Sequence, residues 1–155
     1  MLRVNHPTEL VSHVGEDLGA SSWRTISQAM IDTFAGLTGD THWIHTDPIR
    51  AAAEGPFGGT VAHGFMTLGL ITSSMNELLD IGGVAHFVNY GLNSVRFAGP
   101  VGAGSRVRLR QTLADVAQIE GGVRVTTKCT LEVEGAKRPA VVADFIFLAF
   151  SGPKP

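Results

Sequence analysis

An aspartate and a histidine, Asp40 and His45, stand five residues apart in a loop expected over residues 40–46. One helical pattern ends before this loop and another begins after it, so both side chains should have fixed positions. Trp43 and Ile44 lie between them and indicate that the loop packs against the core and is partly dry. A carboxylate and an imidazole held around one water molecule can act as general base and general acid near neutral pH.

Two other interpretations of this cluster stay open. Aspartates in loops often accept hydrogen bonds from nearby backbone amides, and loop histidines are common without any chemical role. A metal site is the second alternative, with Asp40, His42, His45 and His63 as ligands. The spacing of these residues matches no standard zinc pattern, so we expect no bound metal.

A second candidate site lies at the start of a long apolar segment, Val61 to about Leu79. The N-terminus of a helix presents unpaired N–H groups and a partial positive charge. Gly64 lets a ligand oxygen approach its N–H without a Cβ in the way. We therefore expect Gly64 to form an oxyanion hole for a thioester carbonyl or its enolate. His63 is either a hydrogen-bonded structural histidine or part of the site, and the sequence leaves both open.

The rest of the chain predicts helices first and a sheet afterwards. Ser27 is a suitable N-cap for a helix that ends near Gly39, and Asp47–Pro48 begins a short helix. The apolar segment from Val61 is typical of a buried helix. After Gly83 the apolar period changes to two, and four strands are expected: Ala85 to Phe97, Arg106 to Ala117, Gly122 to Glu134 and Ala140 to Phe150. No helix connects them, so the sheet should be antiparallel.

The predicted architecture is α+β, a long central helix wrapped by a curved antiparallel sheet, in a single domain over residues 1–155. Residues 1–20 are expected to form an N-terminal arm or a short helix, and residues 151–155 a frayed tail. Such a sheet leaves one strand edge open, and the last strand is apolar on both faces. Both features indicate pairing with a second copy of the chain.

The composition argues against several classes of protein. The 155 residues include 12 basic and 14 acidic side chains, a net charge of −2, so no overall field favours nucleic acid or an anionic membrane. The start of the chain lacks the apolar core of a signal peptide, and no apolar run is long enough to span a bilayer. The single cysteine, Cys129, fits a reducing compartment. We expect a soluble cytoplasmic protein with Cys129 as a small core residue.

Cofactor motifs are also missing, because the sequence carries neither a complete dinucleotide fingerprint nor a GxxxxGK[ST] phosphate loop. Basic residues alternate along two of the expected strands: Arg106, Arg108 and Arg110 on one, Arg124 and Lys128 on the next. Such a stripe is either a phosphate-binding patch or, more often, the solvated face of a sheet.

The segment FAGLTGDTHWIHTDPIRAA resembles the hydratase-2 motif of the MaoC-like, (R)-specific enoyl-CoA hydratases. The matching positions are Phe34, Leu37, Thr38, Gly39, Asp40, His45 and Ala51. VAHGFMTLGL resembles the helix start of the family, NSVRFAGPVGAGSRV its later strand–turn–strand segment, and GDTHWIHTDP its NodN-like branch. Members commonly have Asn-Pro between the two reactive residues, where this chain has His42–Trp43.

This resemblance implies a hot-dog fold and a homodimer, with the acyl chain and coenzyme A running along the subunit interface. It implies that Asp40 and His45 hold and activate a water while the Gly64 amide stabilises the thioester oxyanion. Thr72 matches a small hydroxyl residue that hydrogen-bonds the catalytic aspartate. The implied reaction is (R)-specific hydration of a trans-2-enoyl-CoA to the (R)-3-hydroxyacyl-CoA, with no metal or redox cofactor.

Two alternatives to the hydratase stay open. A hot-dog acyl-CoA thioesterase would direct a carboxylate-activated water at the same carbonyl. A non-catalytic acyl-CoA or acyl-carrier binding protein would use the same groove without turnover.

Overall fold

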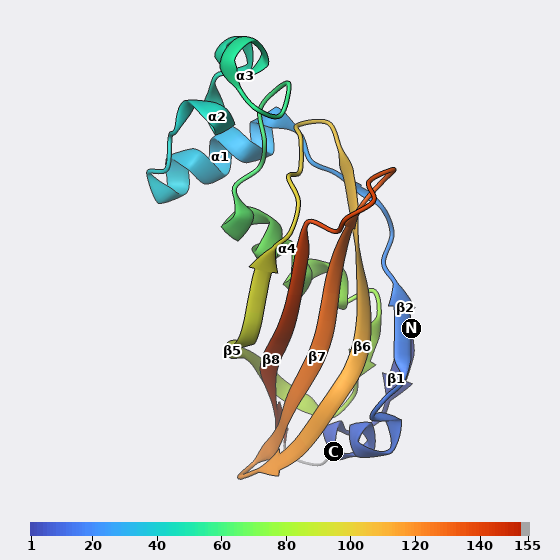
Figure 1. The fold of residues 1–155 in the computed structure, drawn as a ribbon. Coiled ribbons are helices and arrows are strands. Elements are labelled where there is room, and N and C mark those ends of the chain that lie inside the picture. The colour runs from blue at the N-terminus through green and yellow to red at the C-terminus, as the bar shows by residue number, and fades with distance from the viewer. Residues whose placement is uncertain (153–155) are drawn as a thin grey trace.

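A curved antiparallel sheet forms the body of the computed structural model, which describes residues 1–152 (Figure 1). Its main strands follow the predicted ones within two residues: β5 (Val84–Phe97), β6 (Arg106–Ile119), β7 (Gly122–Val133) and β8 (Val141–Ser151). The short strands β2 (Asp17–Ala20) and β3 (Arg24–Thr25) both pair with β6. All pairs within this sheet are antiparallel, so the predicted strand direction is confirmed.

Three helices stand together beyond one end of the sheet: α1 (Gln28–Thr38), α2 (Trp43–Thr46) and α3 (Pro48–Glu54) (Figure 1). The Ser27 side chain caps α1, and the left-handed backbone of Gly39 ends it, as predicted. Asp47 caps α3 by accepting a hydrogen bond from the Arg50 N–H at 3.0 Å. The expectation of a plain loop over residues 40–46 is wrong in part, because α2 adds one helical turn there.

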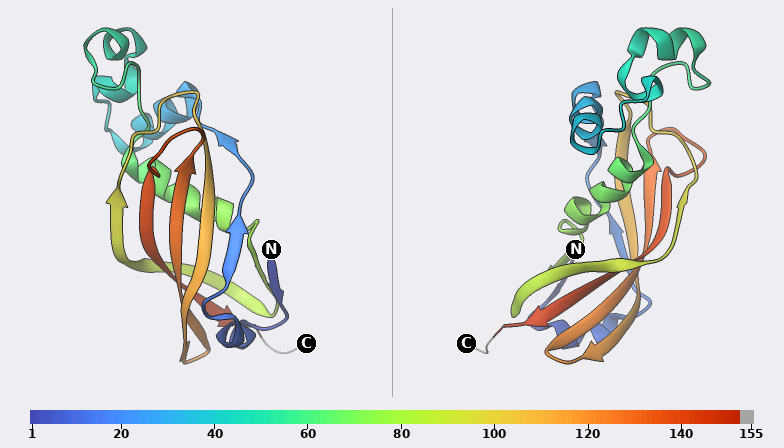
Figure 2. Two further views of the ribbon diagram at one scale, coloured as in Figure 1. Left: turned by 45° about the vertical axis from the view of Figure 1, so that its right-hand side comes forward. Right: turned by 90° about the vertical axis from the view of Figure 1, so that its left-hand side faces the viewer.

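The long apolar helix is α4 (Gly64–Met75), which lies across one face of the sheet (Figure 2). It begins and ends inside the predicted span, because Leu79 belongs to β4 (Leu79–Ile81), which pairs in parallel with β1 (Leu2–Val4). The prediction that this helix is buried on most of its surface is also wrong for a single chain. Met66, Ile71 and Met75 are buried against the sheet, but Phe65 is 72% exposed. A single chain therefore leaves one flank of α4 uncovered.

The first 20 residues are built into the fold, so the predicted separate arm is wrong, whereas the predicted short helix is present as a 3-10 helix. They contain β1, the 3-10 helix η1 (Pro7–His13) and β2. Leu10 in η1 is fully buried in the core. At the other end, Ser151 is part of β8 and pairs with Val84, so the predicted frayed tail does not begin there. The remainder of that tail, residues 153–155, lies outside the described residues.

The strand order ends in the short strand β2 on one side and in the 14-residue strand β5 on the other, so β5 is a long open edge of the sheet. The strand order places β8 between β7 and β5, so both of its edges are paired within the chain, while Val142 on one of its faces stays 45% exposed. On β5 the exposed large apolar side chains are Phe87, Val88, Tyr90, Leu92 and Phe97. An edge strand with this composition is typical of a surface that pairs with another chain.

Two smaller predictions are settled by the side chains of the sheet. Cys129 is buried beside Thr127, and burial raises the pKa of its thiol to about 11, so it is a protonated core residue at neutral pH. The arginine stripe is the ion-paired face of the sheet. Its ion pairs within residues 1–152 are Arg106–Glu134, Arg108–Glu132, Arg110–Asp17, Arg110–Glu132 and Arg124–Asp115. No helix in the described part of the chain has the length and apolarity needed to cross a membrane.

Candidate active site

The two ends of the reactive loop are fixed by helix caps. Asp40 directly follows Gly39, whose φ of 78° ends α1 and turns the chain away from the helix axis. His45 lies in α2, two residues before the Asp47 cap of α3. The loop is therefore short and anchored at both sides, as the sequence predicts.

His45 is held in one tautomer by the backbone of a distant segment. Its Nδ1 lies 2.6 Å from the carbonyl oxygen of Val61. Because a carbonyl oxygen only accepts hydrogen bonds, Nδ1 carries the proton in this contact. The other ring nitrogen, Nε2, then keeps its lone pair in the neutral ring. This is the nitrogen that can take a proton from water.

His63 joins the same cluster from the start of α4. Its ring is 3% exposed and stacks on the ring of His45, with 3.7 Å between centroids and 25° between planes. Its Nε2 lies 2.8 Å from the backbone carbonyl oxygen of Asp40 and 3.9 Å from that residue's Oδ2. The structure thus brings together Asp40, His45 and His63, which are spread over 24 positions of the sequence.

The cluster suits proton transfer better than metal ligation. One possible ligand atom from each of these three residues lies within 4.8 Å of the others. However, His45 Nδ1 and His63 Nε2 both face backbone carbonyl oxygens and carry the protons of those contacts, so neither of these nitrogens offers a lone pair to an ion. His42, the fourth candidate ligand, is outside this group, and its Nδ1 accepts a hydrogen bond from the Ile44 N–H at 3.4 Å.

Gly64 is the first residue of α4, where its N–H has no intrahelical acceptor. Within residues 1–152 this N–H makes no other backbone hydrogen bond, and the His63 side chain does not cap the helix. The donor is therefore free for a ligand. Gly64 also lines a cavity of about 360 Å³ with Phe57 and Val101. A Cβ at position 64 would lie 2.9 Å from Cδ1 of Phe97, so close packing is a second reason for glycine.

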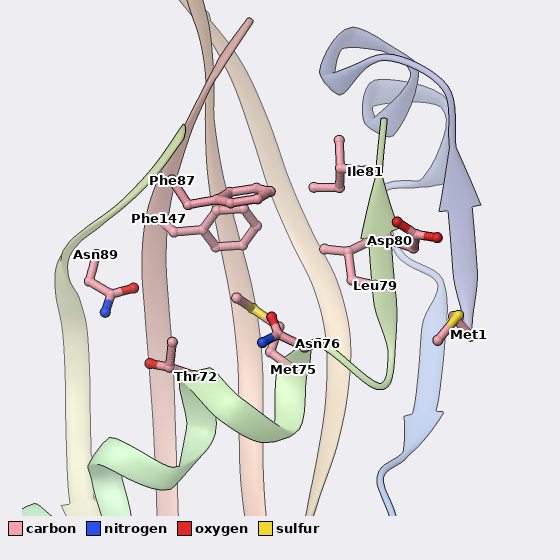
Figure 3. Close-up of a pocket in the computed structure, with 10 residues that line it drawn as sticks. All are labelled: Met1, Thr72, Met75, Asn76, Leu79, Asp80, Ile81, Phe87, Asn89 and Phe147. Atoms are coloured by element: carbon pink, nitrogen blue, oxygen red, sulfur yellow. The ribbon is translucent and has the colours of Figure 1, made fainter. Parts of the chain in front are cut away.

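Thr72 is not near Asp40 of the same chain. It lies eight residues after Gly64, about 12 Å further along the helix axis. Its side chain lines a different cavity of about 520 Å³ (Figure 3). Within the described residues Thr72 makes no hydrogen bond to Asp40, so one chain alone does not form the contact that the resemblance implies.

The sequence did not reveal the walls of this larger cavity. Phe87 of β5 and Phe147 of β8 face each other across neighbouring strands, with ring centroids 6.1 Å apart (Figure 3). Met75 and Leu79 add apolar surface from the end of α4 and from β4. The alternation of apolar residues marks each strand, but it does not show that β5 and β8 are neighbours. The pairing that joins these side chains is therefore visible only in the structure.

Comparisons with known proteins identify the family of this chain. A family model described as "MaoC like domain" matches residues 9–135. This chain belongs to the MaoC-like dehydratase family. It is 49% identical over 139 residues to 3-hydroxyacyl-thioester dehydratase Z of Mycobacterium tuberculosis, covering 89% of this chain and 91% of that protein.

Two further MaoC-like relatives support the branch and the fold. Nodulation protein N of Rhizobium meliloti is 42% identical over 154 residues, covering 95% of this chain and 92% of that protein, so the NodN-like resemblance is confirmed. The solved structure of an (R)-hydratase from Pseudomonas aeruginosa superposes with a TM-score of 0.68 at 22% identity, covering 90% and 83% of the two chains. The predicted α+β hot-dog fold is confirmed.

Proposed function

We propose that this protein is an (R)-specific hydratase that converts trans-2-enoyl-CoA to (R)-3-hydroxyacyl-CoA, and that it catalyses the reverse dehydration at the same site. The proposal rests on one observation above all. A polar atom of each of Asp40, His45 and His63 lies within 4.8 Å of the others, and Gly64, whose N–H begins α4, directly follows His63 in the chain. A relative that is 49% identical and named a 3-hydroxyacyl-thioester dehydratase supports it.

The proposed reaction uses only acid–base groups of the chain, and we propose that no metal or redox cofactor takes part. Asp40 and His45 hold one water molecule and remove its proton as the water oxygen bonds to C3 of the substrate. The C2=C3 π electrons move toward the thioester carbonyl and form an enolate. The Gly64 N–H and the positive end of the α4 dipole stabilise the enolate oxygen. Return of a proton to C2 completes the hydration.

We further propose that the working form is a homodimer joined along β5. The Asp40 side chain is 59% exposed in one chain, which is a poor environment for a strong electrostatic effect on the substrate. A second copy paired along β5 would cover Phe65, Phe97 and the reactive loop. It would also bring the cavity beside Thr72 to the interface, where the acyl chain can enter it. This arrangement accounts for the apolar edge and for the distance between Thr72 and Asp40.

A charge on the β5 edge is expected to separate the subunits. Tyr90 is 64% exposed on that strand, and Tyr90→Asp would place a carboxylate in the proposed apolar interface. Light scattering should give the wild-type protein twice its 16.4 kDa chain mass at micromolar concentration, and the variant should shift toward a single chain. Val11→Asp, at an exposed position of η1, is the matched control and should remain dimeric. A wild-type mass of one chain would contradict the dimer.

The activity itself is tested by following the enoyl-thioester absorbance with trans-2-enoyl-CoA substrates of increasing chain length. Loss of absorbance and formation of the (R)-alcohol are the expected results. A hot-dog thioesterase would instead release free thiol from saturated acyl-CoA. A binding protein would bind acyl-CoA with neither change. Either of these two outcomes would replace the hydratase proposal.

A further inference from the structure

His63 is packed between two rings at the centre of the candidate site. The ring of His45 stacks on it, and the ring of Phe34 lies on it at a tilt, with 5.0 Å between centroids. As the N-cap residue of α4 it could have bonded the first helical amides, but its side chain makes no such bond. Helix capping therefore does not account for a histidine at this position.

The hydrogen bonding of His63 defines its tautomer. Its Nε2 lies 2.8 Å from the Asp40 carbonyl oxygen, so this nitrogen carries the proton and donates. Its Nδ1 is buried and has no partner in the described part of the chain. A proton on Nδ1 would be a buried donor without an acceptor, which is unfavourable. The ring is therefore arranged to donate one hydrogen bond, to the backbone of Asp40.

The contact matters because little else fixes Asp40. Its carboxylate accepts no hydrogen bond within residues 1–152, and the His63 Nε2 lies 3.9 Å from its Oδ2. The position of the carboxylate then depends on the backbone of Asp40. On one side this backbone follows the Gly39 cap, and on the other its carbonyl is held by His63.

The same short segment also holds His45. The Val61 carbonyl accepts from His45 Nδ1, and the His63 ring supports the flat face of the His45 imidazole. Gly64, the oxyanion donor candidate, is the next residue in the chain. The distance between the reactive pair and this donor is thus set within residues 61–64.

We propose that His63 is a positioning residue, which aligns Asp40 by donating a hydrogen bond from Nε2 to its backbone carbonyl oxygen. The expected effect on turnover rests on the proposed hydratase function. The tautomer and the contacts of His63 are independent of that function. The competing explanation is that His63 only fills space between Phe34 and His45, in which case another flat ring would serve equally well.

Two substitutions separate these explanations. His63→Phe keeps a flat ring but has no donor, whereas His63→Gln keeps an amide donor at a similar reach but loses the ring. We expect His63→Phe to lower kcat about 10- to 100-fold with KM changed less than about threefold, because a displacement of about 1 Å can have this effect. His63→Gln should retain clearly more activity. If His63→Phe turns over at the wild-type rate per folded molecule, or if His63→Gln is no better than His63→Phe, the inference fails.

A measurement that needs no substrate completes the test. Long-range 1H–15N spectra of the 15N-histidine-labelled wild-type protein should show His63 as the Nε2–H tautomer, with its signals assigned by their absence in His63→Gln. An Nδ1–H tautomer at His63 would overturn the inference, even if His63→Phe fails to fold. If the wild-type protein hydrates no enoyl thioester but His63 is the Nε2–H tautomer, the proposed function fails and the assignment of the contact stands.

Discussion

Asp40→Asn and His45→Gln are each expected to lower kcat on a trans-2-enoyl-CoA by about a hundredfold or more, the usual scale for a positioned acid or base. Asparagine has the shape of aspartate but no negative charge to accept a proton from water. Glutamine can still donate to the Val61 carbonyl, but it offers no basic nitrogen in place of His45 Nε2. Both variants should keep the fold, because neither change leaves a buried group without its partner.

The same loop supplies controls of the same residue types. His42→Gln changes an exposed histidine that contacts only local groups, and Asp47→Asn retains a residue suited to capping α3. Both should hydrate the substrate at rates within about twofold of the wild-type rate, since surface changes of this kind have small effects. Melting temperature is measured on each preparation so that rates refer to folded protein. Near wild-type rates for both Asp40→Asn and His45→Gln would remove these residues from the proposed mechanism.

Local chemistry explains why much of the fold could be predicted. Ser27, Gly39 and Asp47 each act through groups within a few residues, so their roles as helix caps follow from the sequence alone. The change of apolar period after Gly83 likewise marks the strands, because alternation is a property of each strand by itself. The Asp40 and His45 pair belongs to the same class of signal, since one short loop carries both residues.

Apart from the single helical turn of α2, the features that the sequence did not predict depend on contacts between distant segments. Leu79 fits the apolar pattern of α4, but pairing with Leu2 draws it into a parallel two-stranded sheet. Which strand lies at the edge depends on the order of the whole sheet, and the apolar faces of β8 do not reveal it. The contact of His63 with the Asp40 carbonyl joins residues 23 positions apart, and neither residue type predicts it. Each of these features required a long-range pairing that no local pattern encodes.

The proposed oxyanion role and the packing against Phe97 are two explanations for glycine at position 64, and they predict different results for Gly64→Ala. The added Cβ would lie 2.9 Å from Cδ1 and 3.0 Å from Cγ of Phe97, so the ring must move. Overpacking of this kind costs about 1–3 kcal/mol, so a lowered melting temperature is expected rather than the slight gain usual for alanine in a helix. Gly69→Ala on the same helix is the control, because nothing lies within 4 Å of its Cβ position. It should be stabilised by up to about 1 kcal/mol and remain active.

The double variant Gly64→Ala with Phe97→Ala separates packing from the oxyanion role. Removing the Phe97 ring relieves the contact with the new Cβ. Compared with Phe97→Ala alone, the double variant should therefore lose little further stability. If the Gly64 N–H stabilises the enolate, the Cβ still crowds the approach of the thioester. The kcat of the double variant should then stay about ten- to a thousandfold below that of Phe97→Ala alone, the range for a disturbed oxyanion contact. If Gly64 serves packing alone, the double variant and Phe97→Ala should turn over equally. Comparing kcat and melting temperature across the four proteins of this cycle decides between the two, and equal rates would remove Gly64 from the mechanism.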